Sequence, residues 1–546
     1  MALKITVYDG AGVIGGNKIL LESDAVADGA TRGAAGGAAV FLDFGMSFGG
    51  RGRFFEEFLK PRSALGLTDL LEFGLLPPLA GIYRRDLDLP EWRLWDRYRN
   101  APGFREVRAD AVLLTHAHLD HSAYISFLDP AIPVYTGLVT AVVAKASQDS
   151  APSDIEREVC YATLREPKQG LLTATNFKKV PYKQRPFRVV DRPVPDALKP
   201  FWGQGGSTRA MEPQELRGAE GGPTPNPFRV GELNIKWFPV DHSVPGAGAF
   251  AIETAEGWVV YTGDIRLHGR GRGQTELFRD ECAKLRPLVL ISEGTHPGTT
   301  QPVAEEEVHE RARAAVRAER GLVLADFGPR NVERLLTFLE IARETGRRLA
   351  VTAKDAFLLE AMAAADPATP NPLTPNPLTD DAFVIYGEAR LSRETWERVL
   401  LERYGDKVRV ARDVAADPDA YILCFSFFDL GELVDIRPAG GTYIYSSSEA
   451  YSEEMAIDLA RLRNWVGHFG LTMAGDPDHE RGFHASGHIH GPGLEGLIKA
   501  IAPRYLIPVH TESRDFFVRD GERGWPEVVW PEAGKTYEFR NGRLVG

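Results

Sequence analysis

Residues 111–124 read AVLLTHAHLDHSAY, an apolar strand that runs directly into a cluster of histidines. Histidines two positions apart in extended chain point to the same side, so their imidazoles converge. Imidazole and carboxylate groups together are ligands that suit zinc. The chain holds only 13 histidines in 546 residues, so three within six positions indicate a metal site rather than coincidence in a polar loop. The candidate ligands are His116, His118, Asp120 and His121.

The composition is that of a globular protein with about three or four packing units. Hydrophobic residues make up 43% of the chain and charged residues 26%, which argues against disorder and against a fibrous protein. A net charge of −12 excludes a polycation that coats nucleic acid, so any basic surface must be local. The 55 glycines and 37 prolines predict many turns.

The cysteines and the amino terminus both indicate a soluble protein in a reducing cytoplasm. Cys160, Cys282 and Cys424 lie more than a hundred residues apart without a C-x-x-C pair, which disfavours a disulfide framework and a thiolate zinc site. The amino terminus lacks a charged start followed by an apolar run. No stretch approaches the ~18 consecutive apolar residues of a membrane helix, so we expect no membrane partner.

Short strands dominate the chain before residue 300, and strands alternate with helices after it. The alternation predicts a parallel α/β unit that forms a separate domain. Strands are predicted at 4–8, 18–22, 39–43, 111–114, 132–135, 233–240, 249–254, 258–262, 288–292, 322–325, 349–352, 383–386, 421–425, 443–445 and 505–509. Helices are predicted at 305–319, 332–344 and 452–468, and from residue 495 onward.

Three segments have the composition of insertions. The small-residue stretch at 24–37 and the Pro-, Gly- and charge-rich region at about 145–230 are interpreted as elaborations on a core. Residues 367–381 carry a tandem P-N-P-L-T duplication, and a further T-P-N-P stands at 224–227. Proline at this density excludes a helix or a central strand, so both proline-rich stretches are expected to be exposed loops.

The pattern H-x-H-x-D-H at 116–121 resembles the signature of the metallo-β-lactamase superfamily, and the later ligands of that superfamily have counterparts here. His242 follows a strand in FPVDHSVPG, Asp264 follows one in VVYTGDIR, and His510 ends one in LIPVHTE. The three matches occur in order, each after a predicted strand. The resemblance implies two zinc ions, the first held by His116, His118, His242 and Asp264 and the second by Asp120, His121, Asp264 and His510.

A narrower resemblance is to the β-CASP nuclease branch, and within it to ribonuclease J. Glu293 in LISEGTH stands where β-CASP nucleases carry an acidic residue, and His488 lies in FHASGHIHG, in which His484 and Ser486 also match. The roughly two hundred residues between Glu293 and His488 are where that branch inserts its β-CASP domain. Asp43, in FLDFGMSFG, stands where ribonuclease J carries an aspartate behind the metal ligands.

The resemblance implies an α/β fold, namely a metallo-β-lactamase αββα sandwich interrupted by an α/β β-CASP domain. The expected boundaries are 1–298 for the first part of the metallo-β-lactamase domain, 299–480 for the β-CASP domain and 481–546 for the final part. Little chain follows the last predicted strand, so the separate carboxy-terminal domain of many ribonuclease J proteins is expected to be missing. A homodimer is left open.

The resemblance also implies roles for the site residues. Two metals a few ångströms apart supply a hydroxide nucleophile and neutralise charge on a phosphodiester. We expect His488 to protonate the leaving 3′ oxygen, Glu293 to orient His488, and Asp43 to fix a ligand imidazole. Asp120 is assigned to catalysis as well as to the metal. The histidines interpreted as surface or core residues, because they match no ligand position, are His268, His296, His309, His468 and His479. His490, close to His488, is interpreted as a bystander of that motif rather than a catalytic residue.

Substrate contacts are expected close to these residues. Positive charge with interleaved aromatic rings grips a single strand of nucleic acid. The stretch RLHGRGR at 266–272 follows a metal ligand and offers Arg266 and Arg270, whereas KKVPYKQRPFR at 178–188 is explained at least as well as a solvated face. His484 and Ser486 are the other expected contacts. Residues 424–436 replace the T-G-S-Q-G-E-P type loop of ribonuclease J, so 5′-end recognition and exonuclease or endonuclease mode are left open.

The leading hypothesis is a zinc-dependent β-CASP ribonuclease that hydrolyses single-stranded RNA by metal-activated hydroxide. A β-CASP DNA nuclease is an alternative, but such relatives tend to carry an aliphatic residue where His510 stands. A small-ester or thioester hydrolase would lack the long insertion. A non-catalytic RNA-binding scaffold would commonly have lost ligands that are all present here.

Overall fold

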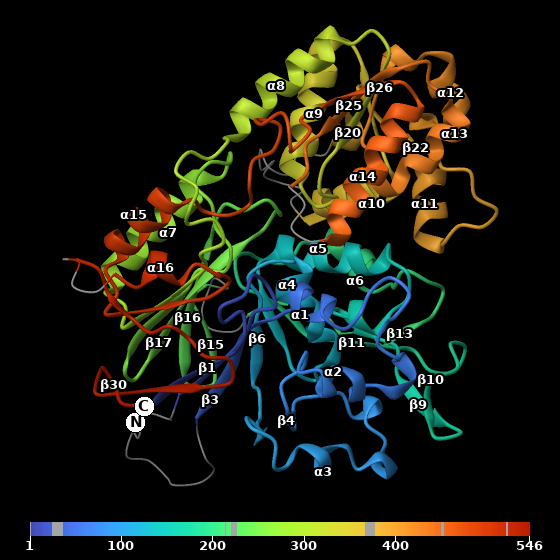
Figure 1. Ribbon diagram of the computed structural model, residues 1–546. Helices are drawn as coiled ribbons and strands as arrows, with labels where there is room; N and C mark the ends of the chain where they lie inside the picture. The colour runs from blue at the N-terminus through green and yellow to red at the C-terminus, as the bar shows by residue number, and fades with distance from the viewer. Residues whose placement is uncertain are drawn as a thin grey trace.

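In the computed structural model, strand β3 (Ala38–Phe44) has hydrophobic side chains buried on both faces. Val40 and Leu42 belong to one hydrophobic cluster, whereas Phe41 and Phe44 belong to another. A strand buried on both faces lies inside a layered fold. β3 is the middle strand of a nine-stranded sheet (Figure 1). The order across this sheet is β14 (Arg217–Gly218), β12 (Phe187–Val189), β7 (Val134–Thr136), β6 (Ala111–Leu113), β3, β2 (Lys18–Ser23), β1 (Leu3–Asp9), β29 (Thr536–Arg540) and β30 (Arg543–Leu544).

A second sheet of seven strands packs against the first. Val40 of β3 and Phe250 and Ile252 of the second sheet share one cluster and are fully buried. Burial of side chains between two sheets supplies most of the driving force for such a sandwich. The order across the second sheet is β15 (Phe228–Val230), β16 (Leu233–Pro239), β17 (Gly248–Thr254), β18 (Gly257–Tyr261), β19 (Val289–Ser292), β27 (Tyr505–Pro508) and β28 (Glu527–Val528).

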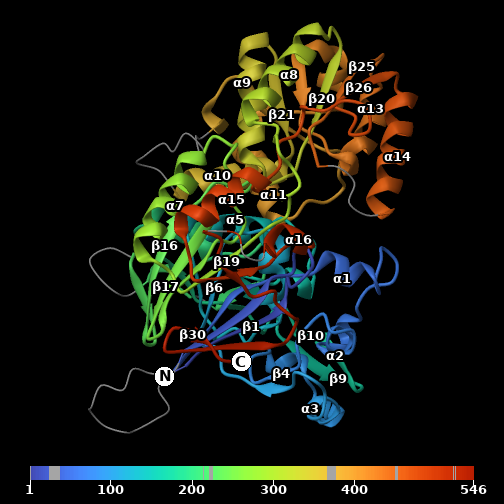
Figure 2. The same ribbon diagram turned by 60° about the vertical axis from the view of Figure 1, so that its left-hand side comes forward.

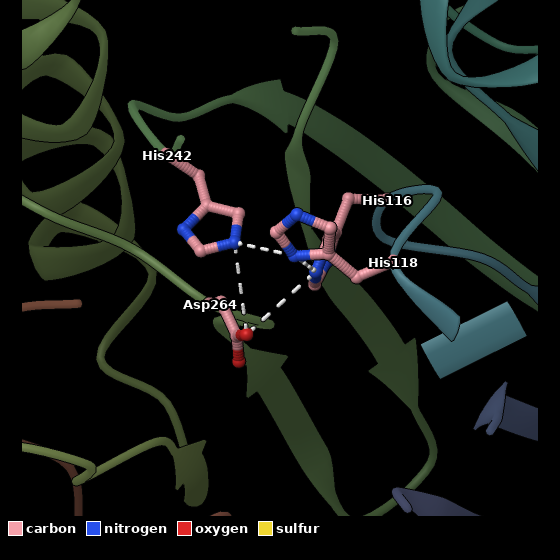
Figure 3. Close-up of side chains that lie close together, drawn as sticks. All are labelled: His116, His118, His242 and Asp264. Carbon is pink, nitrogen blue, oxygen red and sulfur yellow. Dashed lines mark hydrogen bonds and ion pairs between the residues drawn. The ribbon is translucent and has the colours of Figure 1, made fainter. Parts of the chain in front are cut away.

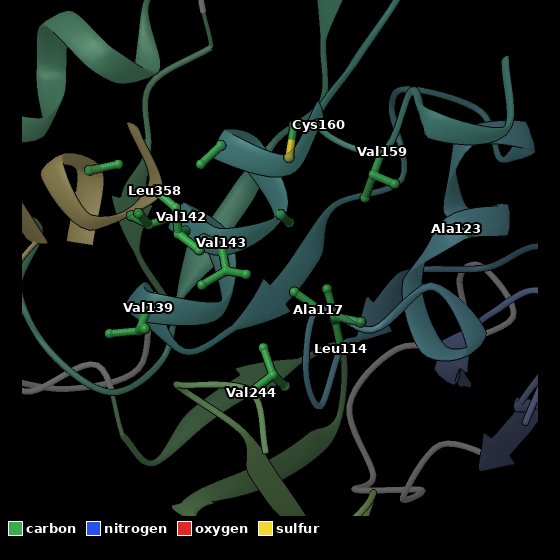
Figure 4. Close-up of a cluster of buried hydrophobic side chains, with 14 of the residues drawn as sticks. Leu114, Ala117, Ala123, Val139, Val142, Val143, Val159, Cys160, Val244 and Leu358 are labelled. Carbon is green, nitrogen blue, oxygen red and sulfur yellow. The ribbon is translucent and has the colours of Figure 1, made fainter. Parts of the chain in front are cut away.

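Helices cover the outer face of each sheet. Helices α7 (Arg272–Leu285) and α15 (Gly491–Ile501) pack on the second sheet, and α4 (Leu119–Ser122) and α5 (Leu138–Asp149) pack on the first. The layers are helix, sheet, sheet and helix, which is the predicted αββα sandwich. Figure 4 shows the apolar cluster that includes side chains of α5 and also Ala117, the residue between two candidate metal ligands.

A third sheet, between residues 322 and 474, contains only parallel strand pairs. Val323 and Leu324, neighbours on β20, point into different clusters, so this sheet is also covered on both faces. Its order is β23 (Val408–Arg409), β22 (Phe383–Tyr386), β21 (Arg348–Val351), β24 (Tyr421–Leu423), β20 (Leu322–Asp326), β25 (Gly441–Tyr445) and β26 (Leu471–Ala474). Its helices are α8 (Glu305–Ala318), α9 (Val332–Thr345), α10 (Ala353–Ala365), α11 (Thr395–Arg403), α12 (Ala411–Ala416), α13 (Leu433–Ile436) and α14 (Glu453–His468).

This parallel α/β unit interrupts the second sheet of the sandwich. β19 and β27 pair directly, although residues 293–504 lie between them in the chain. The two connecting segments lie side by side, because His296 and His490 form a parallel bridge and Gly491 donates its backbone N–H to the carbonyl of Thr299. The chain therefore leaves the sandwich and returns to it at one place, and the inserted unit lies above it in Figures 1 and 2.

The interpretation of residues 145–230 as an elaboration is wrong for part of that region. β12 pairs in parallel with β7 inside the nine-stranded sheet, and its Phe187 and Val189 are fully buried. Trp202, from α6 (Lys199–Trp202), is also buried in the core. The strands here are only two to four residues long, so no apolar run marks them in the sequence.

The remaining elements are short and lie around the sandwich. The structure describes residues 2–23, 37–212, 214–219, 226–365, 377–448, 453–519, 522 and 524–546. The predicted loops at 24–37, 224–227 and 367–381 lie largely outside these residues. Among the helices within them, none has the length and apolar character required to cross a bilayer. The short elements are α1 (Phe48–Gly52), α2 (Thr68–Glu72), α3 (Leu94–Tyr98), α16 (Arg514–Phe517), β4 (Leu79–Ala80), β5 (Arg105–Glu106), β8 (Tyr161–Ala162), β9 (Arg165–Lys168), β10 (Leu171–Ala174), β11 (Tyr182–Gln184) and β13 (Met211–Glu212).

Candidate metal centre

The carboxyl ends of several strands meet at one edge of the sandwich. β18, β19 and β27 are parallel neighbours, in register at Tyr261, Ile291 and Ile507. Because parallel strands end on the same side, the residues that follow them emerge together. β16 ends at the same edge, and β6 of the facing sheet leads into the histidine cluster. These strands deliver His116, His242, Asp264, Glu293 and His510.

The seven predicted metal ligands come together in two groups that share Asp264. Within each group, the ligand atoms all lie within 4.8 Å of one another. Figure 3 shows the side chains of the first group pointing toward a common point. The first group is His116, His118, His242 and Asp264, and the second is Asp120, His121, Asp264 and His510.

The buried polar atoms of this centre fit a cation. Asp264 Oδ2 lies 3.1 Å from His121 Nε2 and 3.6 Å from His116 Nε2. Yet both carboxylate oxygens of Asp264 and Nε2 of His121 are buried without a hydrogen-bond partner among the described residues. Buried polar atoms are rarely left unpaired, and a set of imidazoles and carboxylates is a donor set that suits a metal ion. The residues present therefore fit the metal that their types predict.

Burial and charge prepare these imidazoles for a metal. Burial lowers the pKa of His118 to about 4 and holds the pKa values of His116 and His242 well below the usual value. These three side chains are neutral at physiological pH, as metal ligands must be. Burial would also lower the pKa of His121, but the surrounding carboxylates, Asp264 first, raise it well above its usual value. The position of His121 therefore favours positive charge, which a metal ion supplies.

Asp43 holds the metal ligands from behind. The fully buried carboxylate accepts hydrogen bonds from His121 Nδ1 at 2.7 Å, from Tyr261 Oη at 2.7 Å, and from the backbone N–H and hydroxyl of Thr115, both at 2.8 Å. A proton on Nδ1 of His121 leaves Nε2 free to face the metal groups. Asp43 has a φ of 56° and His510 a φ of 53°, and such strain in side-chain-bearing residues is typical of functional sites.

Gly45 lets the loop after β3 approach the second ligand group. A Cβ at this position would lie 1.7 Å from the backbone oxygen of Asp120, so no other residue fits without movement of the loop. The next residue, Met46, donates its backbone N–H to the carbonyl of Leu119 at 3.0 Å. The loop that begins with FLDFG is therefore packed directly on the ligand segment.

A third group of side chains overlaps the second. Glu293 Oε2 lies 3.1 Å from His488 Nδ1, and the two stand close enough to Asp264 and His510 to form a further potential metal group. Burial would lower the pKa of His488, but Glu293 and Asp264 raise it to about 9. Thr295, which the sequence did not single out, lies with its hydroxyl 2.8 Å from His510 Nδ1 and 2.9 Å from Glu293 Oε2. A lone threonine in a loop carries no sequence signal for this role.

Arg266 does not face a substrate, contrary to the prediction. Its side chain is completely buried, and the guanidinium pairs with Asp241 at 3.1 Å, with Glu305 at 3.1 Å and also with Glu333. It donates to the carbonyl of Ser486 at 3.3 Å. Three carboxylates compensate the desolvation of this arginine, so it belongs to the interior of the protein rather than to a phosphate-binding surface.

The other arginines expected to meet a phosphate backbone are also engaged within the protein. Arg270 is partly exposed but forms a bidentate pair with Glu340, with both distances 2.8 Å. In the stretch 178–188, Arg185 is buried and donates to five backbone carbonyls, which makes this part of the stretch structural.

A cavity of about 230 Å³ opens beside His488. His484 and Ser486, the predicted substrate contacts, line it, as do Tyr445 and Arg481 from the inserted unit side. Burial lowers the pKa of His484 to about 4. Three further histidines, none of them predicted to belong to the site, line the same cavity, because the fold brings together segments that are distant in the sequence. They are His268, His296 and His490.

The helix-sheet-sheet-helix sandwich with an inserted parallel α/β unit fits a metallo-β-lactamase fold of the β-CASP type. A crystal structure described as a protein of unknown function from Enterococcus faecalis V583 has the same fold, with a TM-score of 0.62 and 20% identity over 99% of this chain and 100% of that chain.

The named relatives are ribonuclease J proteins, which confirms the resemblance. The chain is 27% identical over 287 residues to ribonuclease J 2 of Streptococcus pyogenes serotype M3, covering 52% of this chain and 47% of that protein. It is 26% identical over 288 residues to ribonuclease J of Mycolicibacterium smegmatis, covering 51% and 47%. The chain thus spans about half the length of these relatives. No protein-family model matches it.

The Asp43→Asn variant tests whether Asp43 organises the metal ligands. The asparagine amide nitrogen cannot accept the hydrogen bonds that the Asp43 carboxylate now accepts, so the orientation of the ligand His121 would be lost. We therefore expect the affinity for zinc to fall by about 10- to 100-fold. The measurement is a zinc titration against a competing chelator. Asp110→Asn is the matched control, because Asp110 also caps a backbone N–H, that of Ala39, but at the other end of β6. Equal affinities for Asp43→Asn and the wild type would contradict the assignment.

Proposed function

We propose that this protein is a zinc-dependent ribonuclease that hydrolyses phosphodiester bonds of single-stranded RNA. The observation that carries the proposal is the pair of ligand groups sharing Asp264, with the His488 and Glu293 pair directly beside them. The named relatives are ribonuclease J proteins, and the similarity covers about half of each. The domain boundaries that we propose on this topology are 1–298, 299–480 and 481–546, and we place the protein in the cytoplasm.

Two zinc ions are proposed for the two groups. His116, His118, His242 and Asp264 would hold one, and Asp120, His121, Asp264 and His510 the other. Two such ions would lower the pKa of bound water and neutralise charge on a phosphodiester. The protein itself supplies neutral imidazoles, ligands oriented by Asp43 and Thr295, and a buried setting in which charges interact strongly.

The residues of the third group complete the hydrolysis. Cleavage breaks the bond between phosphorus and the 3′ oxygen, and a water oxygen becomes bonded to phosphorus, so the products carry a 5′-phosphate and a 3′-hydroxyl. The leaving 3′ oxygen needs a proton. His488 Nδ1 is hydrogen-bonded to Glu293 Oε2 at 3.1 Å, which fixes the ring and leaves Nε2 for the substrate. Glu293 is in turn held by the backbone N–H of Ile265 at 2.7 Å.

Removal of a metal ligand should abolish hydrolysis. We expect His118→Ala and Asp264→Ala to reduce cleavage of a labelled single-stranded RNA to background, because each leaves a ligand group incomplete. The control is His468→Ala, which changes an exposed histidine on α14. Each variant is assayed beside a matched DNA strand. Undiminished activity in both ligand variants would refute the mechanism, and a clear DNA preference of the wild type would favour a DNA nuclease.

His488 should contribute to turnover rather than to metal binding. General acids contribute about 10²- to 10⁴-fold to rate, so His488→Ala is expected to lower kcat by that range. Glu293→Gln keeps the shape of the side chain but removes its charge and should lower kcat by a smaller factor. Metal content measured on the same samples separates the two roles. A His488→Ala variant that loses its zinc but regains full kcat when zinc is added back would contradict an acid role.

The mode of cleavage can be decided with three forms of one RNA. Residues 424–436, which replace the glycine-rich loop of ribonuclease J, form a 3₁₀ turn over Phe427–Glu432 and helix α13, with Asp429 accepting from Ser426. Gly431 is the one glycine in this segment, so the segment forms no glycine-rich loop for a 5′-phosphate, and we expect cleavage of a circular RNA and little preference between a 5′-monophosphate and a 5′-triphosphate. Release of mononucleotides from the 5′-monophosphate form alone would instead indicate exonuclease action.

A further inference from the structure

Arg330 brings a positive charge from the inserted unit to the metal centre. It lies in the loop between β20 and α9, and its Nη1 donates to the carbonyl of Ala117 at 2.9 Å. Ala117 stands between the candidate ligands His116 and His118. The guanidinium therefore contacts the residue that stands between the two ligands, although Arg330 follows Ala117 by 213 positions in the sequence.

Arg330 forms no ion pair with an acidic residue in the part of the chain that the structure describes. Among the described residues, no carboxylate lies within 4.0 Å of its guanidinium, whereas Arg266 and Arg334, in the same region, both pair with Glu305. Asp120 attracts Arg330 electrostatically but belongs to the second metal group. A metal bound there would neutralise Asp120 and leave Arg330 as an uncompensated cation.

Arg157 supplies a second cation, from the turn that follows α5. It ends the 3₁₀ turn Ile155–Arg157, is exposed, and forms no ion pair within the part of the chain that the structure describes. The turn that carries Arg157 contacts the segment just after α4, because Tyr124 Oη donates to Glu156 Oε1 at 3.3 Å. Burial and then the charge of Arg157 lower the pKa of Arg330 to about 10, so Arg330 remains charged at neutral pH. Two like charges without a counter-ion repel each other unless an anion lies between or beside them.

Exposed aromatic residues lie in the segment that pairs with the turn of Arg157. Glu156, next to Arg157, pairs with Arg51 of α1 at 3.1 Å. Around α1, Phe48 is 53% exposed and Phe58 is 88% exposed, and Arg53 lies over the ring of Phe54. The segment begins immediately after Gly45 and Met46, which pack on the ligand loop. In Figures 1 and 2, α1 lies near the boundary between the sandwich and the inserted unit.

We propose that Arg330 and Arg157 form a phosphate-binding site for the backbone of single-stranded RNA next to the metal centre, and that Phe48 and Phe58 stack its bases. Arginine binds phosphate through a fork of N–H donors, and aromatic side chains stack bases without regard to sequence. Because the arginines come from different parts of the chain, the site exists only when the inserted unit is docked on the sandwich. The proposal rests on the proposed function, and it names the substrate contacts that Arg266 and Arg270 do not provide.

Binding of a cleavage-resistant strand tests the site separately from catalysis. The probe is a fluorescent phosphorothioate RNA, titrated by anisotropy with the zinc-loaded protein at several salt concentrations. We expect Arg330→Ala and Arg157→Ala each to weaken binding about tenfold and to make the salt dependence shallower by about 0.7 in the logarithmic slope. Arg330→Lys should retain the slope. Phe58→Ala should weaken binding about fivefold or more with the slope unchanged.

Matched controls separate local contacts from general electrostatics and from folding. Arg320→Ala removes an exposed arginine at the opposite end of β20, and Leu277→Ala removes an exposed apolar side chain on α7. Both should bind as the wild type does. Arg157 and Phe58 are exposed, so their variants are expected to fold normally. A DNA strand of the same sequence should lose affinity in the arginine variants as well, because the contact is with phosphate.

The outcomes distinguish this site from the proposed function. Unchanged affinity and slope in Arg330→Ala and Arg157→Ala would overturn the site, as would an equal loss in Arg320→Ala or a loss confined to RNA. If the wild type binds the strand through these arginines but fails to hydrolyse an unmodified RNA, the site stands and the proposed function fails. If Arg330→Ala and Arg157→Ala both hydrolyse RNA as the wild type does, the proposed function stands and the phosphate-binding site fails.

Discussion

Asp264 is completely buried, and its Oδ2 lies within 4 Å of the imidazole nitrogens of five histidines. A buried carboxylate without a hydrogen-bond partner costs several kcal/mol unless positive charge compensates it. Burial would raise the pKa of Asp264, but His121, His510 and His488 hold it well below its usual value. The ligand loop, the strand ends and the segment returning from the inserted unit all converge on this one charge.

A second buried ionic cluster joins the inserted unit to the sandwich. Arg334 of α9 pairs with Glu305 at 2.9 Å and donates to the backbone carbonyls of Ser446 and Phe483. Arg266, two residues after Asp264, pairs with the same Glu305 and donates to Ser486. The segment that carries His488 is thus held from both units. Loss of one partner from such a cluster typically costs about 3–5 kcal/mol, so the position of His488 depends on the docking of the inserted unit.

Apolar runs and ligand motifs were readable in the sequence because they are local. The predicted strands at 18–22 and 383–386 correspond to β2 and β22 within one residue at each end, and helix 332–344 corresponds to α9. Helix α10 was not predicted, because its apolar residues surround the whole helix where it packs against α5. The polar strands between residues 160 and 220 were not predicted either, because they carry no apolar run.

The sequence by itself determined the expected fold class, the candidate ligands and the expected place of the insertion, because short local motifs, each after an apolar strand, resemble those of a known superfamily. Tertiary structure alone decides which charged side chains are free of ion pairs within the protein and so available to bind a ligand. Arg266 and Arg330 look equally exposed in a sequence, yet one is surrounded by three carboxylates and the other has none within ion-pair distance among the described residues. The physical reason is that charge compensation depends on neighbours brought together from distant parts of the chain, which no local pattern records.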